Sequence, residues 1–165
     1  MKYLAIDNAL AISGWAIFEE ENLLKFDIFK TKSTDPLGKR LSDIYSEICD
    51  FIESNDIDFI FFEDCQQQSN RNVQTYHKLS MVKGIVEFTC FQEEKECECL
   101  SPSSWRSVLK NKFGFNFGRA RTEQKAKAKE FVKDHFNVTA SEDECDAICL
   151  GYAGILDKES KKTAW

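Results

Sequence analysis

The chain has 165 residues, of which 42% are hydrophobic and 13% aromatic, and it contains two prolines. We expect one globular domain over residues 1–165, long enough to bury a sizeable core. The net charge of −6 excludes a uniformly basic nucleic-acid coat, and no apolar run approaches the ~20 residues of a membrane span. Met1 leads straight into an apolar run without a signal-like pattern, so we expect a cytoplasmic protein with no membrane contact.

The first third of the chain predicts three strands and a helix. Residues 2–7, 13–19 and 23–31 are closely linked apolar segments, which predicts an antiparallel meander. Asp35-Pro36 is typical of a helix start. Apolar residues then recur at helical spacing, so residues 36–54 are predicted to form an amphipathic helix.

The remaining segments alternate between strands and helices. In chain order they are a strand at 57–62, a helix at 73–91, a strand at 96–100, a helix opening at Ser101-Pro102, an exposed loop at 110–121, and helices at 125–136 and 141–157. This βββαβαβααα order predicts an α/β fold in which a mixed sheet is covered by helices.

Charge is distributed unevenly along the chain. The segment from Arg106 to Lys133 contains nine Lys or Arg and two acids, a balance of about +7, so the other residues carry about −13. Such a division favours an anionic partner at the basic segment and cations at the acidic part. A solvated helix face is the alternative explanation of the basic residues.

Four acids are candidates for chemistry. Asp7 and Glu63 each close an apolar strand, where a sheet normally presents ligands. Asp143 and Asp146 are three residues apart on a predicted helix and share one face. If that helix begins against the first strand, four carboxylates converge and repel one another unless divalent cations lie among them. Carboxylate oxygens suit Mg²⁺ or Mn²⁺, and a pair of such ions is an established device for phosphodiester hydrolysis.

Each of these acids also has a simpler explanation. Acids at a helix N-terminus interact well with the helix dipole, and Ser141 with Glu144 fits a capping box. These two effects explain why acids occur at Glu142, Asp143 and Glu144. They explain Asp146 less well, because it lies past the first turn of the predicted helix. Acids that end strands are often turn residues.

Several stretches match, in order, the pattern of a known family. They are Ala5-Ile6-Asp7, Ser13-Gly14-Trp15-Ala16, Phe61-Phe62-Glu63, Lys78 to Gly84 with Ile85-Val86, Ser101-Pro102, and Asp143-Glu144-Cys145-Asp146-Ala147. Through them the chain resembles RuvC-type Holliday-junction resolvases of the RNase H-like superfamily, most nearly the small phage-encoded branch. The resemblance spans nearly the whole chain, and its specific part is the four acids and their order. It implies an RNase H-like fold with a mixed five-stranded sheet flanked by helices.

The resemblance also implies an activity. We expect a metal-dependent endonuclease that resolves four-way junctions, and other branched DNA, by paired symmetric nicks. Two Mg²⁺ or Mn²⁺ ions would be held by the catalytic acids Asp7, Glu63, Asp143 and Asp146, with Asp7 bridging both. If the chain is phage-encoded, it would act in the cytoplasm of a bacterial host. A nuclease acting on RNA–DNA hybrids and a non-catalytic protein that binds branched DNA are the alternatives.

The family is homodimeric, and the resemblance implies a homodimer here. In the family the helix corresponding to 73–91 lies at the subunit interface. Its apolar residues must be divided between the core and a partner: Val73, Tyr76, Leu79, Val82, Ile85 and Val86. A purely intramolecular helix is the alternative.

The basic segment is the predicted DNA-binding region. Cations that neutralise phosphates supply much of the affinity for DNA, and the best candidates are Arg106, Lys110, Lys112, Arg119, Arg121 and Lys125. Phe113, Phe115 and Phe117 either stack on opened bases or pack the loop onto the fold, and we favour packing.

The residues after Glu63 depart from the family pattern. Many bacterial relatives carry an aromatic residue there, whereas this chain has Gln66-Gln67-Gln68. Because glutamines cannot wedge bases apart by stacking, we expect weak sequence selectivity and action on forks and flaps as well as junctions.

Overall fold

A computed structural model describes residues 1–65 and 72–163. Its elements follow the predicted order and are β1 (Lys2–Asp7), β2 (Ile12–Glu19), β3 (Asn22–Lys30), α1 (Leu37–Asn55), β4 (Phe59–Glu63), α2 (Val73–Gln92), β5 (Glu96–Leu100), α3 (Pro102–Phe113), α4 (Arg121–Phe136) and α5 (Glu142–Thr163). Among the described residues, no helix is both long and apolar enough to cross a membrane.

The strands form one mixed five-stranded sheet, as predicted, in the order β3-β2-β1-β4-β5. The β1–β2 and β2–β3 pairs are antiparallel, whereas β4 runs parallel to both β1 and β5. Ile6 of β1 is registered with Phe62 of β4. The next residues, Asp7 and Glu63, therefore emerge side by side at one edge of the sheet.

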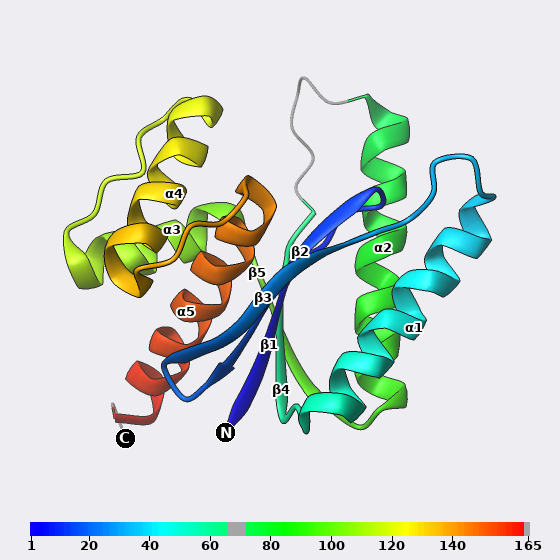
Figure 1. Ribbon diagram of the computed structural model, residues 1–165, viewed down its shortest axis with the longest axis horizontal. Helices are drawn as coiled ribbons and strands as arrows, with labels where there is room; N and C mark the ends of the chain where they lie inside the picture. Colours follow the sequence, from blue (N-terminus) through cyan, green and yellow to red (C-terminus); the bar gives the residue numbers. More distant parts are fainter. Residues whose placement is uncertain (66–71, 164–165) are drawn as a thin grey trace.

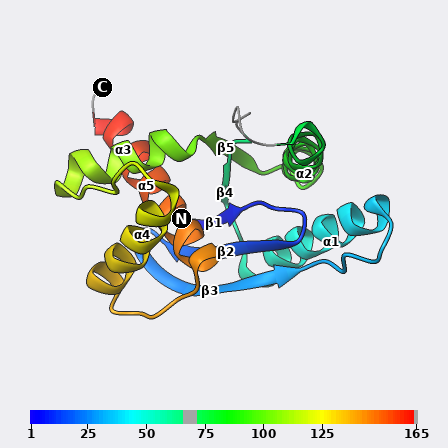
Figure 2. The same ribbon diagram turned by 90° about the horizontal axis from the view of Figure 1, so that it is seen from above.

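Helices cover both faces of the sheet (Figures 1 and 2). Successive strand residues point to opposite faces, so Leu4 and Ile6 pack into the core with α1 and α2, while Tyr3 and Ala5 pack into the core with α3, α4 and α5. The sheet therefore separates two hydrophobic cores, and the helices carrying the basic segment and the last two acids lie together on one side.

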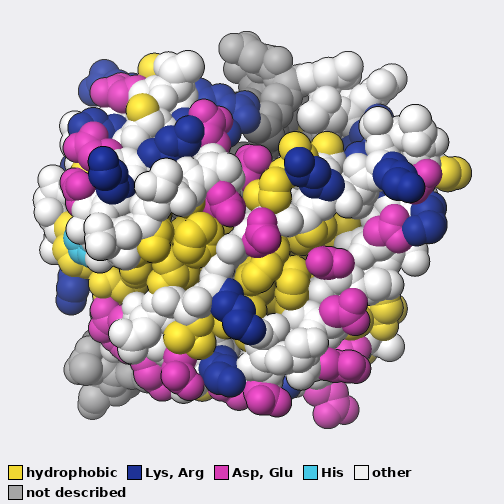
Figure 3. All heavy atoms as spheres, in the orientation of Figure 1, with side chains coloured by type: hydrophobic (Ala, Val, Ile, Leu, Met, Phe, Trp, Pro, Cys, Tyr) yellow, Lys and Arg dark blue, Asp and Glu magenta, His cyan; other side chains and the backbone are white. Residues whose placement is uncertain are grey.

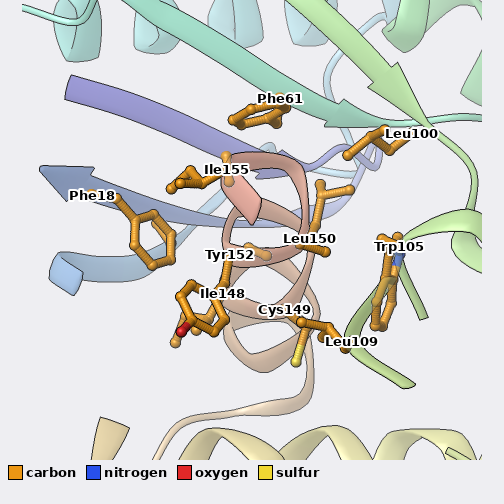
Figure 4. Close-up of a cluster of buried hydrophobic side chains, with 14 of the residues drawn as sticks. Phe18, Phe61, Leu100, Trp105, Leu109, Ile148, Cys149, Leu150, Tyr152 and Ile155 are labelled. Carbon is orange, nitrogen blue, oxygen red and sulfur yellow. The ribbon is translucent and has the colours of Figure 1, made fainter. Parts of the chain in front are cut away.

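Helix α5 packs against the sheet through buried hydrophobic side chains (Figure 4). A Cβ added at Gly151 would come within 2.6 Å of the Ala5 Cβ and 2.7 Å of the Phe18 ring. The absence of a side chain at this position thus allows α5 to rest directly on β1 and β2.

The segment expected as an exposed loop at 110–121 is partly helical, so this expectation is wrong in part. Helix α3 continues to Phe113 and ends at Gly114, whose φ of 68° suits glycine and whose N–H bonds to the Lys110 carbonyl at 2.8 Å. Helix α4 begins at Arg121 rather than 125. The connecting residues are anchored by Phe117, which is 4% exposed.

We expect Gly151→Ala to lower the free energy of unfolding by about 1–3 kcal/mol, because the new methyl group overpacks a tight contact. Gly38→Ala is the matched control, since Gly38 also lies in a helix and its added Cβ meets nothing within 4 Å. Urea unfolding followed by circular dichroism measures both variants. Equal stability of the two variants would contradict the close packing of α5.

Candidate active site

The four predicted acids line one pocket. Asp7 ends β1, Glu63 ends β4, and Asp143 and Asp146 lie in the first two turns of α5. The pocket has a volume of about 500 Å³. The convergence expected from the strand ends and the helix spacing is thus present in the structure.

Gly14 brings the start of α5 to the sheet edge. It is paired with Asp7 across β1 and β2, and an added Cβ would lie 1.9 Å from the Asp143 carbonyl oxygen. No side chain fits between this strand and the helix start. The glycine therefore permits the approach of Asp143 to Asp7.

The acids at the start of α5 have distinct partners. Glu144 completes the capping box: its carboxylate accepts the Ser141 N–H, and its own N–H bonds to the Ser141 hydroxyl at 3.4 Å. Glu142 forms an ion pair with Lys125 at 2.9 Å. Helix capping and surface pairing therefore account for these two acids but leave the positions of Asp143 and Asp146 unexplained.

The pocket makes ionisation of Asp7 and Asp146 unfavourable. Burial, followed by the charges of Glu63, Asp146 and Asp143, raises the pKa of Asp7 well above its usual value. Burial, with a smaller contribution from Glu63, raises the pKa of Asp146 to about 6. Lys125 and Arg106 oppose this rise. Further positive charge in the pocket would stabilise the ionised carboxylates.

The donor set fits a hard divalent cation, because its side chains offer carboxylate oxygens. Within the described residues, no group of three or more His, Cys, Asp or Glu side chains already has the arrangement of a metal site. The four carboxylates share a pocket and repel one another, and a cation between them would relieve that repulsion.

Glu63 is held by two residues that the sequence did not suggest. The Trp105 indole N–H donates to Glu63 Oε1 at 3.1 Å, and the Asn8 side-chain oxygen accepts the Glu63 backbone N–H at 2.8 Å. Asn8 is buried directly after Asp7, so its place beside a candidate ligand was a usable signal. Trp105 carried only the signal of a packing residue.

The predicted DNA-binding residues divide into two groups. Arg106, Arg119, Arg121 and Lys125 line the same pocket as the acids. Lys110 and Lys112 lie in the last turn of α3, are exposed, and are not part of the pocket lining. Lys and Arg side chains also gather over α4 in Figure 3.

Arg106 has an unusual environment. Its guanidinium lies 4.6 Å from the Trp105 ring centroid, and its Nε is buried without a hydrogen-bond partner among the described residues. A buried donor of this kind requires an acceptor.

The three phenylalanines of the basic segment pack onto the fold, which confirms the favoured interpretation. Phe113 and Phe115 contact the Phe131 ring at 5.7 and 5.3 Å, and Phe117 contacts the Trp105 ring edge-to-face at 5.5 Å. Gln66-Gln67-Gln68, predicted to influence selectivity, lie outside the described residues.

Sequence comparison finds curated relatives over almost the whole chain. The crossover junction endodeoxyribonucleases RuvC of Finegoldia magna and Caldicellulosiruptor saccharolyticus are 24% and 23% identical to it, covering 98% and 97% of this chain and 96% and 95% of the relatives. RuvC of Synechocystis is 25% identical, over 93% of this chain and 90% of the relative. No protein-family model matches the chain.

Structural comparison finds the same fold in solved resolvases. Thermus thermophilus RuvC in complex with a Holliday junction substrate matches with a TM-score of 0.78 at 14% identity, over 97% of this chain and 96% of that one. The yeast mitochondrial Holliday junction resolvase Ydc2 matches with a TM-score of 0.64 at 12% identity, over 98% and 80% of the two chains. The predicted resemblance to RuvC and the RNase H-like fold are confirmed.

The raised pKa of Asp146 predicts that stability without cations falls as pH increases. This aspartate ionises near 3.8 in an unfolded chain but near 6 in the fold, so in that interval the folded state holds the extra proton. Cations compete with that proton, and Mg²⁺ should therefore raise the Tm more at about pH 8 than at about pH 5. Scanning calorimetry with EDTA or Mg²⁺ measures this, and Asp146→Asn should reduce the pH dependence. A pH-independent effect of Mg²⁺ would contradict the cluster.

Proposed function

We propose that this chain is a RuvC-type crossover junction endodeoxyribonuclease that resolves four-way DNA junctions. The observation that carries the proposal is a single pocket that brings the four candidate catalytic acids together with four basic side chains, on a RuvC-like fold. The carboxylates suit cations and the basic side chains suit phosphates, which is the combination that cutting a DNA backbone requires.

Asp7, Glu63, Asp143 and Asp146 would hold the divalent cations, Mg²⁺ or Mn²⁺, of which we expect two, with Asp7 as the central ligand. Such ions activate the attacking water and stabilise the leaving oxygen in phosphodiester hydrolysis. The acids supply the negative charge that retains the cations next to DNA, and their burial in a shared pocket makes cation binding favourable.

Arg106 and Lys125 are the leading candidates for contact with the scissile phosphate, since both line the acid pocket and their charges act on Asp146. Arg119 and Arg121 would bind the neighbouring backbone. Lys110 and Lys112 would contribute more to long-range attraction than to the cleavage step, because they lie outside the pocket lining.

A substrate panel separates this function from its alternatives. We expect metal-dependent cutting of fixed and mobile four-way junctions, with weaker cutting of forks and flaps and none of linear duplex. Preference for an RNA–DNA hybrid would instead favour the other nuclease, and binding without nicking would favour a non-catalytic DNA-binding protein. Mapping the products on all four strands tests for paired, ligatable nicks that carry 5′-phosphates.

Asp7→Asn should reduce junction cleavage by about 10³-fold or more, because the metal site supplies several kcal/mol of transition-state stabilisation. Junction binding should persist or improve, since one negative charge is removed from the DNA-facing pocket. Gel-based cleavage and fluorescence anisotropy measure the two properties.

Asp50→Asn is the matched control for Asp7→Asn. Asp50 is exposed on α1, outside the pocket lining, so it should leave both properties unchanged. Cleavage by Asp7→Asn at the wild-type rate with Mg²⁺ would contradict the assignment of this site.

A homodimer built through α2 completes the proposed function. Helix α2 keeps Val82 and Val86 in the core but exposes Val73, Met81, Phe88 and Phe91. At 100° per residue, these four positions share one side of the helix with Gly84. An exposed apolar stripe of this kind is typical of a protein interface.

The stripe suits a second copy of the same helix. Around Gly84 there is open space, with nothing within 4 Å of an added Cβ, so a crossing helix can approach closely at this point. A two-fold axis through the crossing would pair the stripe with itself. Two identical sites related by that axis would match the two-fold symmetry of a junction cut by paired nicks.

Phe88→Asp should convert the dimer to a monomer and uncouple the two nicks. Phe88 is 51% exposed, so a charge there disfavours an apolar interface while sparing the protomer core. Light scattering coupled to size exclusion measures the mass. A cruciform plasmid reports coupling, because paired cuts give linear DNA whereas independent cuts give nicked circles.

Leu24→Asp is the control for Phe88→Asp. Leu24 has a similar exposure of 48% but lies on β3, away from α2, so this variant should stay dimeric and produce linear DNA. A Phe88→Asp protein that stays dimeric would contradict the proposed interface.

A further inference from the structure

The geometry around Glu63 fixes this side chain through a hydrogen bond from the protein. Trp105 reaches it from α3, 42 residues further along the chain, and its indole N–H donates to Oε1 at 3.1 Å. Asn8 holds the backbone of the same residue from the end of β1. Glu63 is thus fixed at its backbone and at its carboxylate by different elements.

Trp105 is itself rigidly placed. It is 1% exposed and lies in the first turns of α3, where the Ser101 hydroxyl accepts the Ser104 N–H at 3.1 Å and Pro102 occupies the first turn. Figure 4 shows its ring beside α5 with the nitrogen turned toward the strands. The ring also packs against Phe117. A donor held in this way defines one direction for the Glu63 carboxylate.

The Trp105 indole N–H is an uncharged donor, and it restrains a carboxylate that would otherwise be repelled by its neighbours. Four carboxylates that line one pocket repel, and without a fixed partner a glutamate side chain can rotate away from the others. An N–H donor restricts the orientation of the Glu63 carboxylate without adding a cation that would compete with a metal. Buried tryptophan in turn needs an acceptor for its N–H.

We propose that Trp105 is a positioning residue, which holds the Glu63 carboxylate in its ligating orientation before a divalent cation binds and so sets the affinity of the site for that cation. This inference rests on the proposed function, since it assigns Glu63 as a metal ligand. The competing role is packing alone, in which the ring fills the core and the hydrogen bond has no effect on the cation.

Trp105→Phe separates these roles, because it keeps most of the ring and removes the donor. We expect Mn²⁺ affinity to fall about 10- to 100-fold, the range typical for loss of a residue that orients a metal ligand. Isothermal titration of the metal-free protein measures it without reference to cleavage. Junction binding in EDTA should be unchanged.

Trp15→Phe is the matched control. Trp15 packs against Phe51 at 4.6 Å, on the α1 side of the sheet, and is not part of the pocket lining. It should lose some packing but keep wild-type Mn²⁺ affinity. Equal affinities of the Trp105→Phe and wild-type proteins would overturn the proposal.

A spectroscopic measurement tests the link between Trp105 and the cation site in the unmodified chain, even if Trp105→Phe does not fold. The chain has three tryptophans, so ¹⁵N spectra contain three indole signals, with Trp15→Phe and Trp165→Phe assigning the other two. Mg²⁺ should shift the Trp105 indole signal and leave that of Trp15 in place. A Trp105 signal that does not respond to saturating Mg²⁺ would also overturn the proposal.

Failure of this inference is distinguishable from failure of the proposed function. If the wild-type protein neither binds Mn²⁺ nor nicks junctions, the function itself is wrong. If the wild type does both and Trp105→Phe binds Mn²⁺ equally well, only the positioning role is wrong.

Discussion

The close contact between α5 and the first two strands is the constraint on which the site depends. Gly14 leaves no room for a side chain beneath the Asp143 carbonyl, and Gly151 rests on Ala5 two turns further along the helix. These two contacts fix both the distance and the direction of α5 relative to β1. A helix displaced outward by one methyl group would move Asp143 and Asp146 together away from Asp7. The packing of a core helix and the geometry of the acid pocket are therefore set by the same contacts.

The burial and mutual repulsion of the carboxylates oppose this packing. Burying Asp7 and Asp146 near two other acids makes their ionised forms unfavourable, as the raised pKa values of both show. The surrounding protein offsets part of the cost through Lys125, Arg106 and the N-terminus of α5, but the pKa values of both aspartates stay raised. Concentrating destabilising charge in one place is a common property of sites built for function rather than stability.

The features predicted from the sequence are those with local signals. Strand-ending acids and the three-residue spacing of Asp143 and Asp146 are visible in short windows, and the order of the elements predicts a mixed sheet covered by helices. The Trp105–Glu63 bond has no such signal, because it joins residues 42 positions apart. The apolar stripe of α2 is also not evident from the sequence. Apolar residues lie on opposite sides of that helix, so the sequence shows no clear helical periodicity of hydrophobic and polar residues. The end of α3 was a missed local signal, because Gly114 is a common helix terminator.

The end of β4 connects the two faces of the protein. Consecutive residues there point to opposite sides of the sheet: Glu63 meets Trp105 of α3, whereas Asp64 forms a 2.7 Å ion pair with Lys83 of α2. Bonding to Asp64 raises the pKa of Lys83 to about 12, so this lysine stays charged. Helix α2 also carries the stripe proposed to bind a second protomer. Glu63 therefore links the candidate catalytic edge to α3, and Asp64 links it to α2 and the proposed interface. A shift of α2 would act on Asp64, the residue next to Glu63.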